Sequence, residues 1–205
     1  MSPALVTVIL ASGLAVIVAR RRSVAIALLA VQSLALSVGA FTLTGGRSAA
    51  FLVASGVLAV KALVLPVLLY ALMRRTREPH LVAAARGPVS RLAAASALVL
   101  LAAVTVPRIP GTGAYVEHAA VGLLLTGMAI VATRRPALHQ LLGMIVAENG
   151  CSLLAVAVPG GLAYLIEVGA LFDLVLAITV AALFMQRIHT LLGTGNTELL
   201  RGLRD

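Results

Sequence analysis

Residues 48–73 read SAAFLVASGVLAVKALVLPVLLYALM, an apolar run with one charged side chain, Lys61, at its centre. Lys61 is also the only lysine in the chain. A run of this length predicts a helix that spans a lipid bilayer, which requires about 20 apolar residues. A charge at that depth costs roughly 2.5–3.5 kcal/mol on an insertion scale, so Lys61 needs a compensating group.

The composition of the whole chain points the same way. Of its 205 residues, 61% are hydrophobic and only 11% are charged. A soluble domain cannot bury so much apolar surface, so we predict an all-α integral membrane protein. The net charge is +9, but the arginines lie in short clusters between apolar runs. This distribution argues against nucleic acid as a partner, because a nucleic-acid-binding protein carries its basic residues along one face.

The apolar runs predict seven transmembrane helices. If alternate connections are cytoplasmic, 13 of the 15 arginines fall on that side, and only Arg47 and Arg108 fall on the other. Cytoplasmic loops are enriched in arginine and lysine, so this bias predicts an N-terminus outside and a C-terminus in the cytoplasm. The predicted spans are residues 3–19, 23–43, 48–73, 89–106, 115–133, 137–157 and 162–188.

No internal repeat is visible, so an inverted-repeat transporter is not supported. We expect the sequence to be organised in four parts. The parts are an N-terminal three-helix part (1–78), a cytoplasmic connection (79–91), a four-helix part (92–192) and a polar C-terminal tail (193–205).

Four ionisable residues inside apolar runs are the candidates for chemistry: Lys61, Glu148, Glu167 and Asp173. Counting helical rise from the predicted ends of their spans places Lys61, Glu148 and Asp173 near the membrane midplane. Glu167 should lie about 9 Å nearer the outer surface than Asp173. Desolvation favours neutral carboxyl and amine groups, whereas pairing favours their charged forms. These residues are therefore predicted to form a proton relay, or alternatively static pairs that lock helices together.

Five other polar or helix-breaking residues are candidate accessories. Pro66 should kink its helix and expose a carbonyl beside Lys61. Gln32 is expected to bond between helices, and Asn149 to share a polar seam with Glu148. Glu117 and His118 begin the fifth predicted span, where an interfacial position is the simpler interpretation.

We expect no cofactor in this chain and no catalytic site. Its one cysteine, Cys151, excludes a cysteine-ligated iron–sulfur cluster. No phosphate-binding glycine loop, zinc-ligand spacing or nucleophile elbow is present. His139 and His189 could in principle hold a haem, but their polar neighbours indicate an interfacial position.

Two segments resemble a known family. Residues 140–150, QLLGMIVAENG, and residues 166–173, IEVGALFD, resemble membrane component E of hydrogenase-4 and of related formate-hydrogenlyase-type complexes. Lys61 and Pro66 also fit that family's third helix. The last three helices of such proteins are similar to subunit K of respiratory complex I, which carries two intramembrane glutamates. Glu167 matches the later of the two subunit K glutamates. The earlier subunit K glutamate aligns with Ile145, which lies one turn before Glu148.

The resemblance implies a non-catalytic subunit in the membrane arm of an energy-converting complex. It would lie in the bacterial plasma (inner) membrane as a multi-pass protein, beside antiporter-like subunits. Nickel–iron and iron–sulfur centres would belong to partner subunits. The charged relay would couple electron transfer to proton or sodium translocation. The alternatives are a stand-alone secondary cation/proton transporter and a scaffold whose charges dock neighbouring helices.

Overall fold

The chain folds into a bundle of long helices. The computed structural model describes residues 1–44, 49–75, 87–108, 110–111, 115–134 and 137–157, and single positions 171, 175, 178, 179, 182, 186 and 190. Within these residues six helices are defined: α1 (Pro3–Val18), α2 (Arg22–Thr44), α3 (Ala49–Arg75), α4 (Pro88–Thr105), α5 (Val116–Thr133) and α6 (Ala137–Ala157).

The ends of several helices are set by local sequence. The Ser2 side chain accepts a hydrogen bond from the Leu5 amide (3.4 Å) and caps α1, and Pro3 follows at the first helical position. Pro88 occupies the same position in α4. Tyr115 adopts a left-handed conformation (φ 65°) immediately before α5. Glu117 lies in the first turn of α5, where the helix dipole stabilises a negative charge.

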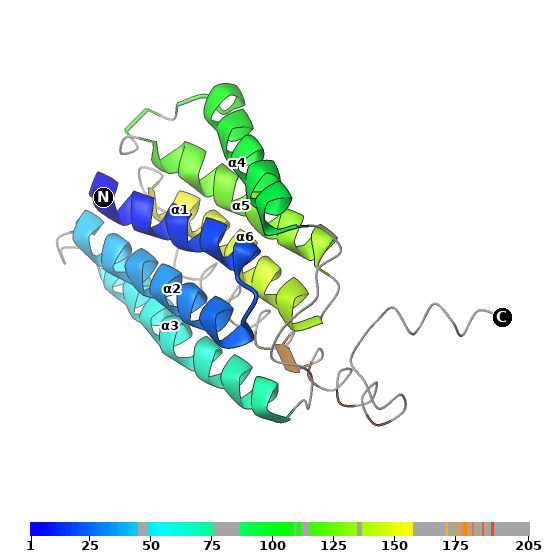
Figure 1. Ribbon diagram of the computed structural model, residues 1–205. Coiled ribbons are helices and arrows are strands. Elements are labelled where there is room, and N and C mark those ends of the chain that lie inside the picture. The colour runs from blue at the N-terminus through cyan, green and yellow to red at the C-terminus, as the bar shows by residue number, and fades with distance from the viewer. Residues whose placement is uncertain are drawn as a thin grey trace.

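Four helices form the centre of the bundle. α1 packs against α2 and α5, while α6 packs against α5 and α2. α3 flanks α2 at one edge and α4 flanks α5 and α1 at the opposite edge (Figure 1). The core between them is made of aliphatic side chains that are almost fully buried, such as Ile9, Leu36 and Leu123.

Helices α5 and α6 approach so closely that their backbones touch. A Cβ atom added to Gly127 would lie 2.5 Å from the Gly143 carbonyl oxygen, and one added to Gly150 would lie 2.6 Å from the Ala120 carbonyl oxygen. Small residues permit such contacts between apolar helices. This packing fixes the position of α6, which carries Glu148 and Asn149.

The all-helical part of the prediction agrees with the described residues, but the prediction of seven transmembrane helices is wrong. Two helical segments in the described part are long and apolar enough to cross a membrane: Arg22–Thr42 of α2 and Val116–Thr133 of α5. The predicted topology, with the N-terminus outside and the C-terminus in the cytoplasm, depended on the seven-span count and is withdrawn with it.

For α1 the physical reason for the difference is length. With 16 residues, α1 extends about 24 Å, less than the ~30 Å hydrocarbon core of a bilayer. In α3, which has 27 residues, and in α4, which has 18, the apolar segments found among the described residues are Ser55–Ala71 and Val89–Thr105. The last predicted span, 162–188, lies outside the described residues except at the single positions given above.

Candidate functional site: a buried polar layer

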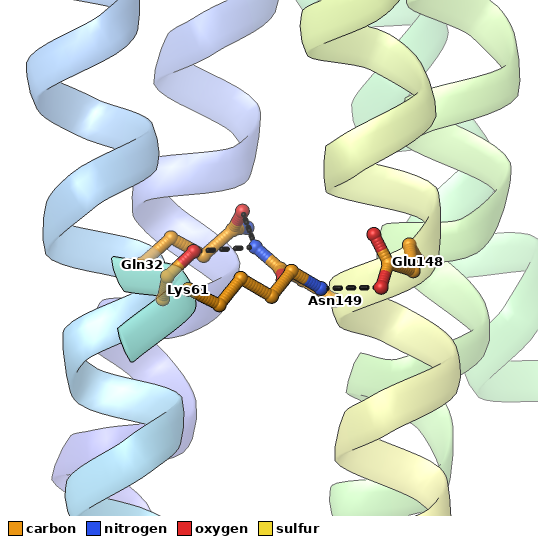
Figure 2. Close-up of polar contacts among 5 residues, drawn as sticks. Gln32, Lys61, Glu148 and Asn149 are labelled. Atoms are coloured by element: carbon orange, nitrogen blue, oxygen red, sulfur yellow. Dashed lines mark hydrogen bonds and ion pairs between the residues drawn. The ribbon is translucent and has the colours of Figure 1, made fainter. Parts of the chain in front are cut away.

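An ion pair joins α3 to α6 inside the bundle. The Lys61 Nζ atom lies 2.5 Å from Glu148 Oε1, and the side chains are 2% and 20% exposed (Figure 2). Both residues lie near the middle of their helices, so the pair sits far from the helix ends. Glu148 therefore supplies the counter-charge that a buried lysine requires. Because α3 has its main contacts with α2, the long lysine side chain has to reach across to α6.

Beside the ion pair, a chain of amide hydrogen bonds crosses three helices. Asn149 Nδ2 donates to Gln32 Oε1 (3.0 Å) and to Ser33 Oγ (3.1 Å), and Gln32 Nε2 donates to the Ile9 carbonyl (3.1 Å). Gln32 and Asn149 are completely buried. Together with the ion pair they form what we call the polar layer: Gln32, Ser33, Lys61, Glu148 and Asn149 (Figure 2).

Asn149 Oδ1 is a buried acceptor of the polar layer. No donor among the described residues lies within hydrogen-bonding distance of Asn149 Oδ1. A buried oxygen of this kind is costly to leave unsatisfied, and it is suited to accept a hydrogen bond from a water molecule or a protonated group. The layer can therefore hold charge and also accept a further hydrogen bond.

Gly13 of α1 makes room for the amide chain. A Cβ atom at this position would lie 2.7 Å from Gln32 Nε2 and would also collide with Leu123. The absence of a side chain lets α1 approach Gln32, which then reaches the Ile9 carbonyl. Sequence reasoning missed both Gly13 and Ser33, because a small residue in an alanine-rich helix gives no distinctive signal.

The remaining predicted site residues fall into two groups. Pro66 lies within α3, which continues through it to Arg75. Glu167 and Asp173 lie outside the described residues, so their predicted role in the relay stays a prediction. His189, for which an interfacial position was predicted, also lies outside the described residues.

Glu117 and His118 lie at the start of α5, away from the polar layer. The Glu117 side chain is buried, and its Oε1 atom lies 3.9 Å from His118 Nδ1. His118 Nε2 is 3.1 Å from the Val106 carbonyl oxygen, and the Arg108 guanidinium lies 5.5 Å from the centre of the Tyr115 ring. The structure thus places these residues in contacts that join the start of α5 to the end of α4.

Two arginines that sequence reasoning assigned to loops are buried instead. Arg91 Nη1 donates to the Ile17 carbonyl (3.2 Å), and Arg134 Nη2 donates to the carbonyls of Ile17 (2.9 Å) and Ala19 (2.8 Å). They cap the C-terminal end of α1, where the helix dipole favours positive charge. His139, at the start of α6, is fully buried nearby.

These features define a class of protein: a helical bundle whose described part holds two helices long enough to cross a membrane and an ion pair between a buried lysine and a glutamate. The chain belongs to the same family as uncharacterized protein Rv0085 from Mycobacterium tuberculosis (strain ATCC 25618 / H37Rv). The two sequences are 32% identical over 160 residues, which cover 73% of this chain and 70% of that protein. No protein-family model matches the chain. No solved structure matches it either.

Proposed function

We propose that this chain is a non-catalytic membrane subunit of an energy-converting complex of the hydrogenase or formate-hydrogenlyase type. It would lie in the bacterial plasma membrane beside antiporter-like subunits, and the metal centres would belong to partner chains. Its contribution is a charged relay that couples electron transfer to proton or sodium translocation. The family resemblance of residues 140–150 and the two helices of membrane-spanning length support this proposal.

The observation that carries the proposal is the contact between Lys61 and Glu148. At a separation of 2.5 Å a proton can pass from the ammonium nitrogen to the carboxylate oxygen, which leaves a neutral amine and a neutral acid. The pair has no net charge in either state. A charge that approaches or leaves in a neighbouring subunit can therefore decide which state is favoured. The amide chain beside the pair holds α2 and α6 in register.

The test is to replace Glu148 in the assembled complex and to measure protons translocated per electron transferred. Glu148→Gln keeps the size of the side chain but cannot ionise. We expect translocation to slow by about 100-fold, the typical contribution of a positioned proton-transfer group. Electron transfer should continue, because the redox centres belong to other chains. Glu117→Gln, at the end of the bundle, is the matched control.

A second variant separates a relay from a static lock. Lys61→Arg retains a positive charge that can pair with Glu148, but a guanidinium does not release its proton. A relay predicts that Lys61→Arg assembles and fails to translocate. Normal translocation by both Lys61→Arg and Glu148→Gln would contradict the proposed function and leave the pair as a structural contact.

A further inference from the structure

Positive charge gathers at the end of the bundle where α1 finishes. Arg20 and Arg21 connect α1 to α2 and are exposed. Arg91 and Arg134 are buried there, on the carbonyls of the last turn of α1. We call these four residues the arginine end. The acids among the described residues are Glu117 and Glu148, one at the start of α5 and the other in the middle of α6, so neither lies at the arginine end.

The arginine end is short of negative charge in the part of the chain that the structure describes. Burial, and then repulsion by Arg91, lowers the pKa of Arg134 to about 10. No acceptor among the described residues contacts the Nε or Nη1 atoms of Arg134. Clustered guanidinium groups without a carboxylate partner attract an anion, and phosphate oxygens suit their geometry.

An apolar groove begins near Arg20 and Arg21. Its volume is about 540 Å³, and it is lined by Ser23, Ile26 and Ala27 of α2 and by Pro66, Val67 and Tyr70 of α3. Ser23 follows Arg20 by three residues, so it lies within about 11 Å of that residue along the chain. The lining residues of the groove come from α2 and α3, which lie side by side (Figure 1). Val67 is 70% exposed within it, so the groove is open at the surface.

A molecule that fits both features carries a negative headgroup and a hydrocarbon chain. We propose that the bundle binds an anionic phospholipid, with its phosphate on Arg20 and Arg21 and one acyl chain in the groove between α2 and α3. Basic pockets between membrane helices bind anionic headgroups in this way, and arginines near the surface add affinity. The inference rests on the membrane location in the proposed function, and it is independent of the relay.

Binding can be measured with the full chain, purified in detergent and stripped of lipid. The probes are dioleoylphosphatidylglycerol, dioleoylphosphatidylcholine, glycerophosphoglycerol (the headgroup without chains) and inorganic phosphate. Native mass spectrometry gives the bound lipid, and the shift in melting temperature gives the affinity. We expect phosphatidylglycerol to bind at least about tenfold more tightly than phosphatidylcholine, a preference that salt should reduce.

Two pairs of variants test the two halves of the site. Arg20→Gln with Arg21→Gln should lower the affinity for phosphatidylglycerol by about 20- to 30-fold, since each arginine near an anionic headgroup contributes about fivefold. Arg108→Gln, beyond the other end of α4, should leave it unchanged. Ala27→Phe should fill the groove and weaken both lipids, whereas Ala97→Phe, on the exposed face of α4, should not. Val67→Ala is the milder groove variant if Ala27→Phe does not fold.

The outcomes are distinguishable. Equal binding of the two lipids, or full affinity after loss of both Arg20 and Arg21, would overturn the proposal. Equal protection by inorganic phosphate, with no effect of Ala27→Phe or Val67→Ala, would show an anion site without a lipid and would also overturn it. Because none of these variants touches the polar layer, failure here leaves the relay proposal intact.

Discussion

In the ion pair of the polar layer, removal of one charge should destabilise the fold more than removal of both charges. Loss of one partner from a buried pair typically costs about 3–5 kcal/mol, whereas an apolar pair of similar volume is often tolerated. We therefore predict that Lys61→Met and Glu148→Leu each destabilise the bundle strongly and that the double variant recovers most of the loss. Thermal unfolding in detergent, analysed as a double-mutant cycle, measures the coupling. Additive effects of the two substitutions would contradict this interpretation of the pair.

Asn149 permits a separate prediction for the amide chain. Asn149→Leu removes the donor that both Gln32 Oε1 and Ser33 Oγ accept from, and it leaves them buried. We expect a loss of about 1–3 kcal/mol in the free energy of unfolding, the usual cost of an unsatisfied buried group. Cys151→Ala is the control, because Cys151 lies two residues away and is exposed. An equal effect of the two substitutions would argue against the hydrogen bonds as the cause.

At the scale of single residues, the sequence predicted some members of the polar layer but not the arginines that cap α1. Lys61 and Glu148 stand out as charges inside apolar runs, and the structure brings them together. Gln32 and Asn149 stand out as amides in similar runs. Arg91 and Arg134 could not be assigned to the end of α1, because their partners are backbone carbonyls, which have no sequence signature.

At the scale of elements, the contact of α5 with α6 depends on glycine. Gly127→Ala would place a methyl group 2.5 Å from the Gly143 carbonyl and even closer to the Ala147 amide, so the helices must separate. We predict a loss of about 1–3 kcal/mol in unfolding free energy, as for other overpacked cores. Gly56→Ala is the matched control in α3, because nothing lies within 4 Å of its added Cβ atom.

The control substitution Gly56→Ala should itself stabilise the fold slightly. Alanine in a helix is favoured over glycine by about 0.5–1 kcal/mol, so Gly56→Ala should raise the melting temperature slightly. Circular dichroism during heating measures both variants. If Gly127→Ala were as stable as Gly56→Ala, close contact between α5 and α6 would not limit stability.

The ends of the helices agree closely with the ends of the apolar runs. The apolar runs do not, however, predict which helices cross the membrane. The run 115–133 corresponds to α5 (Val116–Thr133), and the run 3–19 corresponds to α1 (Pro3–Val18). Hydropathy locates where a helix forms, because apolar residues continue until a charged or helix-breaking residue intervenes. Hydropathy does not distinguish a helix that crosses a bilayer from a shorter helix that is covered by its neighbours. Helix α1 is of the second kind.

At the scale of the whole molecule, His139 should make stability depend on pH. It lies outside both helices of membrane-spanning length, and its pKa is lowered to about 3, first by burial and then by Arg134 and Arg22. The ordinary value is 6.5, so the unfolded chain binds a proton that the folded chain excludes. Stability should therefore fall as the pH decreases below 6.5 towards 3, by at most about 1.4 kcal/mol per pH unit.

His139→Leu isolates this contribution. Between pH 7.5 and pH 5, unfolding free energy should fall less for His139→Leu than for the unmodified chain. Chemical unfolding in detergent at several pH values gives the two slopes. Parallel slopes would show that His139 does not titrate between the folded and unfolded states.

The capping of α1 by Arg91 and Arg134 has a consequence for biosynthesis. The carbonyl of Ile17 is bonded to side chains 74 and 117 positions later in the chain. The first helix therefore emerges from the ribosome long before the groups that complete its final turn exist. Until translation has passed residue 134, the contacts of Arg134 with the end of α1 cannot form, so that end is completed only after most of the polypeptide has been made.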